Sequence, residues 1–243
     1  MSTKTDISPS IHPAVIERHY GRSATPSGYV REPDKVLDEM ASAMAFARSS
    51  AEQILDMHRA IMGNRMQTPV ANARDSREAT WRAFERLAKR IDAARETARA
   101  ALAEIATATA APPRAAEPAD AMLASEIRTR LAQLSEKERR AVVSGAVSGG
   151  DIATVSAVLN APAILTGMTD AEKEMFRHEW RVNQFPAEVD REQRLGKAIE
   201  DVDRVGPILM SLVGSLTDAA EIDAATASER AAVRARQTAE GDD

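Results

Sequence analysis

The hydrophobic pattern is most regular directly after Pro33. Apolar and small residues recur there in alternating steps of three and four, at Leu37, Met40, Met44, Ala47, Ala51, Ile54, His58 and Ile61. This alternation is the heptad pattern of a helix that packs along one seam. Asp34 is a suitable N-cap, and Gly63-Asn64 supplies residues that tolerate the left-handed conformation at a helix C-terminus. We therefore predict a long helix over residues 34–62.

A second apolar stripe follows a short connector. Asp75 and Glu78 have the spacing of a capping box, whereas Thr68-Pro69 would begin the helix earlier. We expect this helix to form an antiparallel hairpin with the first, over residues 34–111, because the connector is long enough to reverse the chain. The stripe is wider than one seam, which requires a third partner from this chain or from another subunit. Its members are Trp81, Phe84, Leu87, Ala88, Ile91, Ala94, Ala98, Leu102 and Ile105.

Prolines and changes of composition divide the rest of the chain. Four prolines without a sustained period predict an extended arm over residues 1–33, with a turn of helix near 14–18. Closely spaced prolines predict a linker over 112–119. Shorter amphipathic segments predict a compact helical domain over 120–217, and alanine with charged residues predicts a tail over 218–243. Because no segment shows strand alternation bounded by hairpin turns, the expected fold class is all-α.

Cap residues set the expected helix starts in the 120–217 domain. Asp120 is expected to cap a helix that carries Met122, Leu123, Ile127, Leu131 and Leu134 on one side. Gly206-Pro207 is expected to break the helical path before an apolar helix over 208–216, which we expect to pack inside the chain. The remaining start signals are the capping boxes Ser135 with Glu138 and Thr169 with Glu172, and the N-cap Asp151.

Much of the hydrophobic content of the chain is alanine, which contributes little side-chain volume to a core. It provides 47 of the 243 residues, so the 44% hydrophobic content overstates the supply of bulky apolar side chains. Only 3% of the residues are aromatic, whereas the net charge of −5 is too small to favour wholesale disorder. The composition favours a helix-rich, partly elongated protein with a modest core, since alanine is the best helix former.

Several functional classes lack their sequence requirements. The chain has no cysteine, which excludes disulfide scaffolds and thiolate metal sites. We find neither a secretory signal nor a convincing membrane span, so we expect a cytoplasmic protein. The glycine-rich segment 145–150 lacks the lysine and the preceding strand of a phosphate-binding loop, and is expected to be a turn.

Histidines are the natural candidates for catalysis or metal binding. His58 and His178 occupy core-type helical positions, where a helix-interface histidine with one hydrogen-bond partner is expected. His178-Glu179 lacks a second histidine at residue 182, so the zincin motif is absent. His12 and His19 have no third metal ligand nearby in sequence. We therefore predict a non-enzymatic protein without a cofactor or a metal.

The leading hypothesis is a structural or assembly protein that acts through helix–helix interfaces, by self-association or in a larger assembly. Methionine-rich and small-residue helix faces are common at adaptable interfaces. The alternative is a nucleic-acid-associated regulatory or packaging factor that uses Arg82, Arg86 and Arg90, although interleaved acidic residues favour an ordinary charged face. The interface candidates are Leu37, Met40, Met44, Ile54, Ile61, Trp81, Phe84 and Ile91.

Residues 134–186 carry a resemblance. This stretch combines a charged helix start, a GGD turn, the segment VLNAPAILTGMT and a following acidic capping box. It resembles a pattern in uncharacterised helical proteins encoded by phages and prophages of proteobacteria. Such proteins are often encoded near particle-assembly genes, so the resemblance implies a structural or assembly role, and a place in the virion if the chain is encoded by a phage. It implies no catalytic residues.

Overall fold

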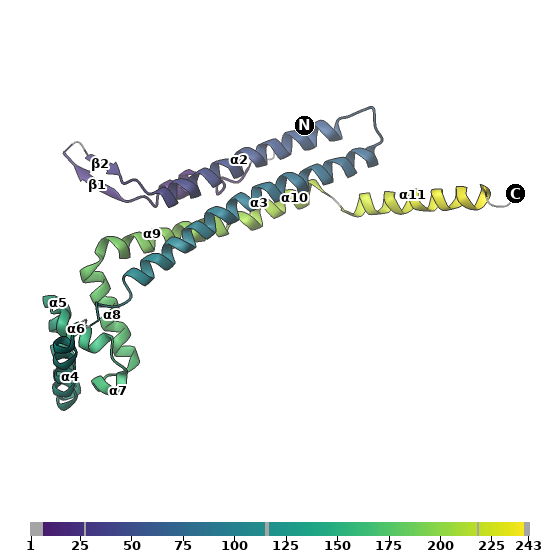
Figure 1. The fold of residues 1–243 in the computed structure, drawn as a ribbon. Helices are drawn as coiled ribbons and strands as arrows, with labels where there is room; N and C mark the ends of the chain where they lie inside the picture. Colours follow the sequence, from purple (N-terminus) through teal and green to yellow (C-terminus); the bar gives the residue numbers. More distant parts are fainter. Residues whose placement is uncertain (1–6, 27, 115–116, 218, 241–243) are drawn as a thin grey trace. The chain divides into compact units, whose positions relative to one another are not determined.

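Helices account for most of the chain in the computed structural model, which describes residues 7–26, 28–114, 117–217 and 219–240 (Figure 1). The all-α fold class is therefore confirmed. In chain order the helices are α1 (Ala14–Glu17), α2 (Lys35–Met62), α3 (Pro69–Ala108), α4 (Pro118–Gln133), α5 (Glu136–Gly149), α6 (Ile152–Leu159), α7 (Ala163–Thr166), α8 (Asp170–Gln184), α9 (Pro186–Asp203), α10 (Val205–Leu216) and α11 (Ala219–Glu240).

The chain divides into two units, each with its own internal packing. Unit 1 comprises residues 1–99 and 197–243, and unit 2 comprises residues 100–196. This division differs from the boundary predicted at the proline segment 112–119, of which residues 115 and 116 lie outside the described residues. The physical reason is that α3 continues without a break to Ala108, and that the proline segment belongs to unit 2.

The proline segment is held by hydrogen bonds inside unit 2. The Ser156 hydroxyl donates to the carbonyl of Pro113 at 2.7 Å, and the Asn160 side-chain amide donates to the carbonyl of Pro112 at 3.1 Å. Both donors come from the region of α6. Prolines end a helix and leave carbonyls without helical partners, and here α6 supplies those partners. The segment is thus packed against a helix within unit 2.

In unit 1, α2 and the first part of α3 run antiparallel. His58 Nδ1 lies 2.8 Å from the Ser76 hydroxyl, and the Arg90 guanidinium donates to the Ser42 hydroxyl at 3.1 Å. The residue later in α2 therefore contacts the residue earlier in α3, as in an antiparallel pair. Of the two predicted starts for the second helix, the earlier one is confirmed, because α3 begins at Pro69 and the Thr68 hydroxyl accepts a hydrogen bond from the backbone N–H of Ala71.

The third helix of unit 1 comes from the C-terminal part of this chain. Arg95 of α3 lies 3.3 Å from Asp203, and Arg77 lies 3.9 Å from Asp223. These two contacts bracket α10, which therefore runs antiparallel to α3. Leu209 and Val213 of α10 are buried, as expected for a helix that packs inside the chain. The predicted break lies one turn earlier than expected, since α9 ends at Asp203 and α10 already contains Gly206 and Pro207.

The N-terminal arm packs on unit 1. Ile11 and Ile16 are buried, and α1 contacts α2, as the predicted turn of helix near 14–18 would allow. An antiparallel pair of short strands, β1 (Arg22–Thr25) and β2 (Gly28–Arg31), follows α1 and was not expected. Because both strands are four residues long and mostly exposed, they carry no apolar alternation that a sequence pattern could reveal. Residues 1–6 and 27 of the predicted arm lie outside the described residues.

The core of unit 2 lies among its short helices. Phe176 and Trp180 of α8 are buried there, and Trp180 meets Phe185 edge to face with ring centres 5.2 Å apart. The other buried core residues are Leu131, Val143, Ala146, Val147, Val155, Val158, Leu159 and Met168, with Ile127 and Leu134 partly buried against them.

Local start signals in unit 2 are confirmed. Ser135 with Glu138 and Thr169 with Glu172 form capping boxes, and Asp151 accepts from the N–H of Thr154. Asp120 was expected as an N-cap but lies in the first turn of α4, because Pro118 begins that helix. In unit 1, the Asp34 cap of α2 is also confirmed.

One glycine helix end differs from expectation and another agrees with it, although the turn expected over residues 145–150 was wrong for 145–149, which belong to α5. Gly63 ends α2 with a φ of −81°, so the expected left-handed end is not used there. Gly150 ends α5 in the left-handed conformation, with a φ of 71°, where glycine carries no steric penalty. Within the predicted tail, the structure forms α11, while residues 218 and 241–243 lie outside the described residues.

Candidate protein-binding surface

Helix α4 leaves most of its apolar side chains exposed. Leu131 is the buried residue of this helix, whereas Met122 is 75% exposed and Leu123 is 48% exposed. Neighbouring α6 adds Ile152, which is also exposed, and α4 contacts both α6 and α7. In α7, Ile164 is exposed as well. Exposed apolar side chains that gather around one helix are typical of interaction sites, whereas isolated ones need no explanation.

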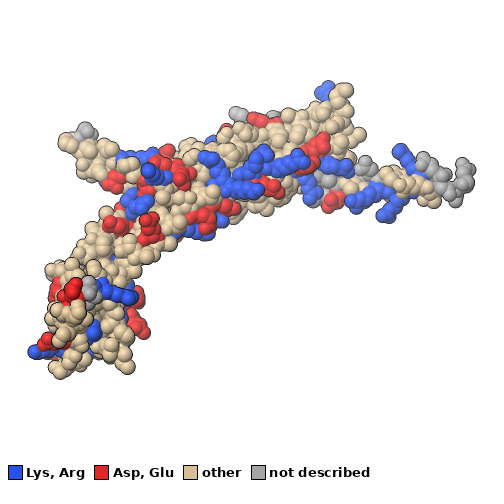
Figure 2. Space-filling view, in the orientation of Figure 1, with Lys and Arg blue, Asp and Glu red and all other residues tan. Residues whose placement is uncertain are grey.

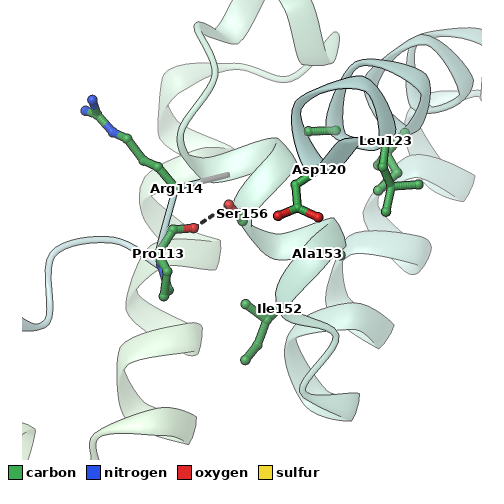
Figure 3. A pocket seen from close by; sticks show the side chains of 9 residues that line it. Pro113, Arg114, Asp120, Leu123, Ile152, Ala153 and Ser156 are labelled. Atoms are coloured by element: carbon green, nitrogen blue, oxygen red, sulfur yellow. Dashed lines mark hydrogen bonds between the residues drawn. The ribbon is translucent and has the colours of Figure 1, made fainter. Parts of the chain in front are cut away.

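The first groove beside α4 lies between α4, α6 and the proline segment, with a volume of about 270 Å³ (Figure 3). Figure 3 shows the Asp120 carboxylate directed into the space between α4 and α6, and the Arg114 side chain extending away from it. The Ser156 hydroxyl on this side is already bonded to Pro113. The remaining lining is mostly apolar and comprises Leu123, Ala124, Ile127, Ile152 and Ala153.

A second groove follows the length of α4 and has a volume of about 500 Å³. Leu123 and Ile127 line both grooves, so they form the crest of a ridge between them. Glu126 and Arg130 stand on the same helix beside this crest, and both are exposed. The other lining residues of the second groove are Leu131, Gln133, Leu134, Val142 and Thr154. We call Met122, Leu123, Glu126, Ile127, Arg130 and Leu134 the α4 surface.

Arg139 of α5 fixes the C-terminal end of α4. Its guanidinium donates to the carbonyl of Leu131 at 3.0 Å and to that of Leu134 at 2.8 Å, and it also donates to the carbonyl of Gly167. The last carbonyls of a helix have no partners within the helix, and a cation is favourable at that end. Arg139 therefore links the end of α4 to α5 and to the end of α7, and so fixes the position of one end of the second groove. In the sequence, Arg139 looks like one of several ordinary surface cations.

The predicted interface residues lie in unit 1, and most of them are covered by the chain itself. Those of α2 and α3 that are buried are Leu37, Met40, Met44, Ile54 and Ile91. Ile61 is half-buried, and so are Trp81 and Phe84, which pack edge to face with ring centres 5.7 Å apart. Large apolar side chains are exposed in both units, for example Met66 and Tyr29 in unit 1. In unit 2, the exposed Met122 and Leu123 are neighbours on α4 and lie beside apolar grooves.

The three arginines proposed for nucleic acid do not form one free basic stripe. Arg82 pairs with Glu78 on its own helix, and Arg90 is turned towards α2, where it bonds Ser42 and lies 5.1 Å from the ring centre of Phe46. Arg86 is exposed and makes no ion pair or hydrogen bond with the described residues. Figure 2 shows Lys and Arg interleaved with Asp and Glu along the helices of unit 1. A phosphate backbone is better matched by a continuous basic face.

His58 and Ser76 form a hydrogen-bonded pair, but they are not placed for nucleophilic catalysis. Ser76 is buried, so no substrate can reach its hydroxyl. Burial, followed by the nearby Arg59 charge, lowers the pKa of His58. This matches the helix-interface histidine with one partner expected at that position. The core-type position expected for His178 was wrong, because its side chain is exposed on α8.

The most densely charged cluster of unit 1 ties the arm to the end of α9. Asp201 Oδ2 lies 2.6 Å from Arg18 and 2.6 Å from His19 Nε2, while Oδ1 accepts from Arg204 at 3.0 Å. Burial opposes the charge of Asp201, but the hydrogen bonds from His19 and Arg18 outweigh it and lower the pKa of the carboxyl. The Asp201 side chain is only 5% exposed, and both of its oxygens are engaged by Arg18, His19 and Arg204. The cluster is therefore a structural anchor for the arm, and sequence reasoning gave no sign of it because its members lie 182 and 183 residues apart.

Comparison with known proteins adds no relative. No family, curated protein or solved structure matches this chain. Within the part of the chain that the structure describes, histidine and carboxylate side chains form no group of three that could hold a metal ion. Over the same residues, no helix combines the length and apolar character needed to cross a membrane.

Proposed function

We propose that this chain is a non-enzymatic structural or assembly protein, and that it acts by binding a helix of a protein partner on the α4 surface. The observation that carries this proposal is the exposure of Leu123 on a ridge between two largely apolar grooves, with the exposed Met122 next to it in α4. A helix inserts its side chains into such grooves and buries apolar area on both sides.

The composition of the α4 surface fits a protein partner. An apolar crest with charged residues beside it has the arrangement of an interface core and its polar rim. Methionine at position 122 adds a flexible side chain that adapts to the shape of a partner. The resemblance of residues 134–186 to phage-encoded helical proteins extends the proposal to a particle component, because such a component works by packing against other subunits.

A photoreactive amino acid placed at Leu123, in the full-length chain produced in its native setting, tests this proposal. We expect a covalent adduct with a second polypeptide, because the side chain at 123 stands on the exposed crest. Ser125 lies on the other side of the same helix, is also exposed, and provides the matched control position. Adducts that appear equally at both positions, or that stay within one chain at position 123, would contradict a partner-binding role for the α4 surface.

A further inference from the structure

The α4 side of the second groove carries two opposite charges, Glu126 and Arg130, at equal distances from its middle. On α4 it extends from Leu123 to Leu134, so its middle lies near Arg128. The crest residues Leu123 and Ile127 share one face because they are separated by four positions, and the C-cap residue Leu134 lines the end of the same groove. A two-fold axis through the middle of this face would place a second α4 antiparallel to the first.

The two charges beside the crest are complementary under that axis. Glu126 and Arg130 lie two residues on either side of position 128, about 3 Å along the helix axis at 1.5 Å per residue. An antiparallel second copy therefore brings its Arg130 level with Glu126, and its Glu126 level with Arg130. In the described residues neither side chain makes an ion pair or a hydrogen bond, although both are exposed. Two reciprocal ion pairs would then form across one interface.

The same operation also gives one apolar pair at each end of the interface. Met122 lies level with Leu134 of the second copy, and the reverse pair forms at the other end. The exposed crest of each α4 can then lie in the second groove of the other copy, as ridges pack into grooves. This arrangement buries the exposed parts of Met122 and Leu123 in both copies and pairs Glu126 with Arg130 across the interface.

We propose that the partner of the α4 surface is a second copy of this chain, bound with its α4 antiparallel about a two-fold axis near residue 128. This inference rests on the proposed function, since it names the occupant of the same surface. It also assigns a separate role to each residue: Leu123 and Met122 provide apolar contact, while Glu126 and Arg130 set the antiparallel direction and the register.

Charge reversal in the full-length chain tests the reciprocal pairs. In E126R both rim positions are positive, and in R130E both are negative, so each variant repels its own copy. We expect each reversal alone to weaken dimerisation at least about tenfold. An equimolar mixture of E126R and R130E restores opposite charges at both contacts, and we expect it to form a mixed dimer. Light scattering over a concentration series, up to about 1 mM, measures the average mass.

Matched controls separate the interface from the fold. S125R adds a charge on the other side of α4 and is expected to leave the dimer unchanged, whereas L123K removes it. Circular dichroism checks that each variant keeps the helical content of the wild type. Because all four positions are exposed, we expect no loss of fold.

Three outcomes would overturn the self-pairing. These are a wild-type chain that stays monomeric over the whole series, a dimer that L123K leaves intact, and a mixture of the two reversals that stays monomeric. The proposed function fails separately, since it depends on the adduct at Leu123. An adduct with a different polypeptide there would keep the proposed function and remove the second copy as the partner.

Discussion

Helices α2 and α4 both carry large apolar side chains, yet they bury them to very different degrees. The buried residues of α2 extend along the helix from Leu37 to Leu55, and α1 and α3 lie beside it. On α4 the buried residue is Leu131, while Met122 and Leu123 remain largely exposed. An apolar stripe therefore shows that a helix needs cover, but the number of neighbouring elements decides whether its own chain provides that cover.

Replacing a leucine by lysine in α2 and in α4 should give the largest difference in the loss of stability. Leu37→Lys places an unpaired charge where the side chain is 0% exposed, so we expect unit 1 to lose more than about 4 kcal/mol of stability. Each unit contains one tryptophan, Trp81 in unit 1 and Trp180 in unit 2. Urea unfolding followed by Trp81 fluorescence, in a Trp180→Phe background, measures the effect. A loss below about 1 kcal/mol would mean that α2 is not covered as described.

Removing the arm anchor should have an intermediate effect on unit 1. Asp201→Asn leaves Arg18 and His19 facing a neutral side chain, and we expect a loss of about 1–3 kcal/mol. Hydrogen exchange in residues 7–20 should become faster, since α1 loses its link to α9. Glu200→Gln is the control, because Glu200 is the exposed neighbour of Asp201 and its contact with Arg204 is long, at 3.9 Å. Equal effects of the two variants would show that Asp201 is not the anchor.

A smaller effect is expected from mild acid, which should lower the stability of unit 1 but not that of unit 2. The pKa of His58 is lowered from 6.5, so below pH 6.5 the unfolded chain binds a proton more readily than folded unit 1 does. The stability of unit 1 therefore decreases as the pH decreases below 6.5. In unit 2, the backbone N–H of Thr169, Arg140 and the Thr169 hydroxyl lower the pKa of Glu172 to about 2. This stabilisation is complete above pH 4.5 and is lost as the pH falls through about 2.

Urea midpoints at pH 7 and at pH 5, read from each tryptophan, check this difference. Between pH 7 and pH 5, His58 should make unit 1 lose stability, whereas Glu172 should leave the stability of unit 2 unchanged. His58→Gln should reduce the loss in unit 1, because glutamine keeps a hydrogen-bonding group without taking up a proton. An unchanged slope in His58→Gln would assign the pH dependence to other groups.

The smallest effect on stability is expected on the α4 surface. Leu123→Lys changes a side chain that is half exposed on the crest, so the stability of the unassociated chain should change by less than about 0.5 kcal/mol. Urea unfolding at low protein concentration, followed by Trp180 fluorescence, measures this in unit 2. A loss as large as that expected for Leu37→Lys would show that Leu123 belongs to the core, and would remove the α4 surface as an interaction site.

The amino-acid sequence by itself determined the all-α class and the helix starts that depend on a few neighbouring residues. Capping boxes and N-caps bind backbone N–H groups within four positions, and Pro69 stands at the first position of α3, where an N–H would have no helical partner. The geometry of these helix starts therefore follows from local spacing. The heptad stripe of α2 likewise identified a face that requires cover. These features need no knowledge of distant residues.

Only the tertiary structure decided which elements provide cover and where the units divide. Asp201 lies 182 residues from His19, and the contact of α3 with the segment around α10 joins parts of the chain more than 100 residues apart. For the same reason, the helical pattern of α4 does not show that Leu131 is buried in the core of unit 2 while Met122 and Leu123 remain largely exposed. Local periodicity sets the direction in which a side chain points from its helix, whereas burial depends on long-range packing that no local pattern contains.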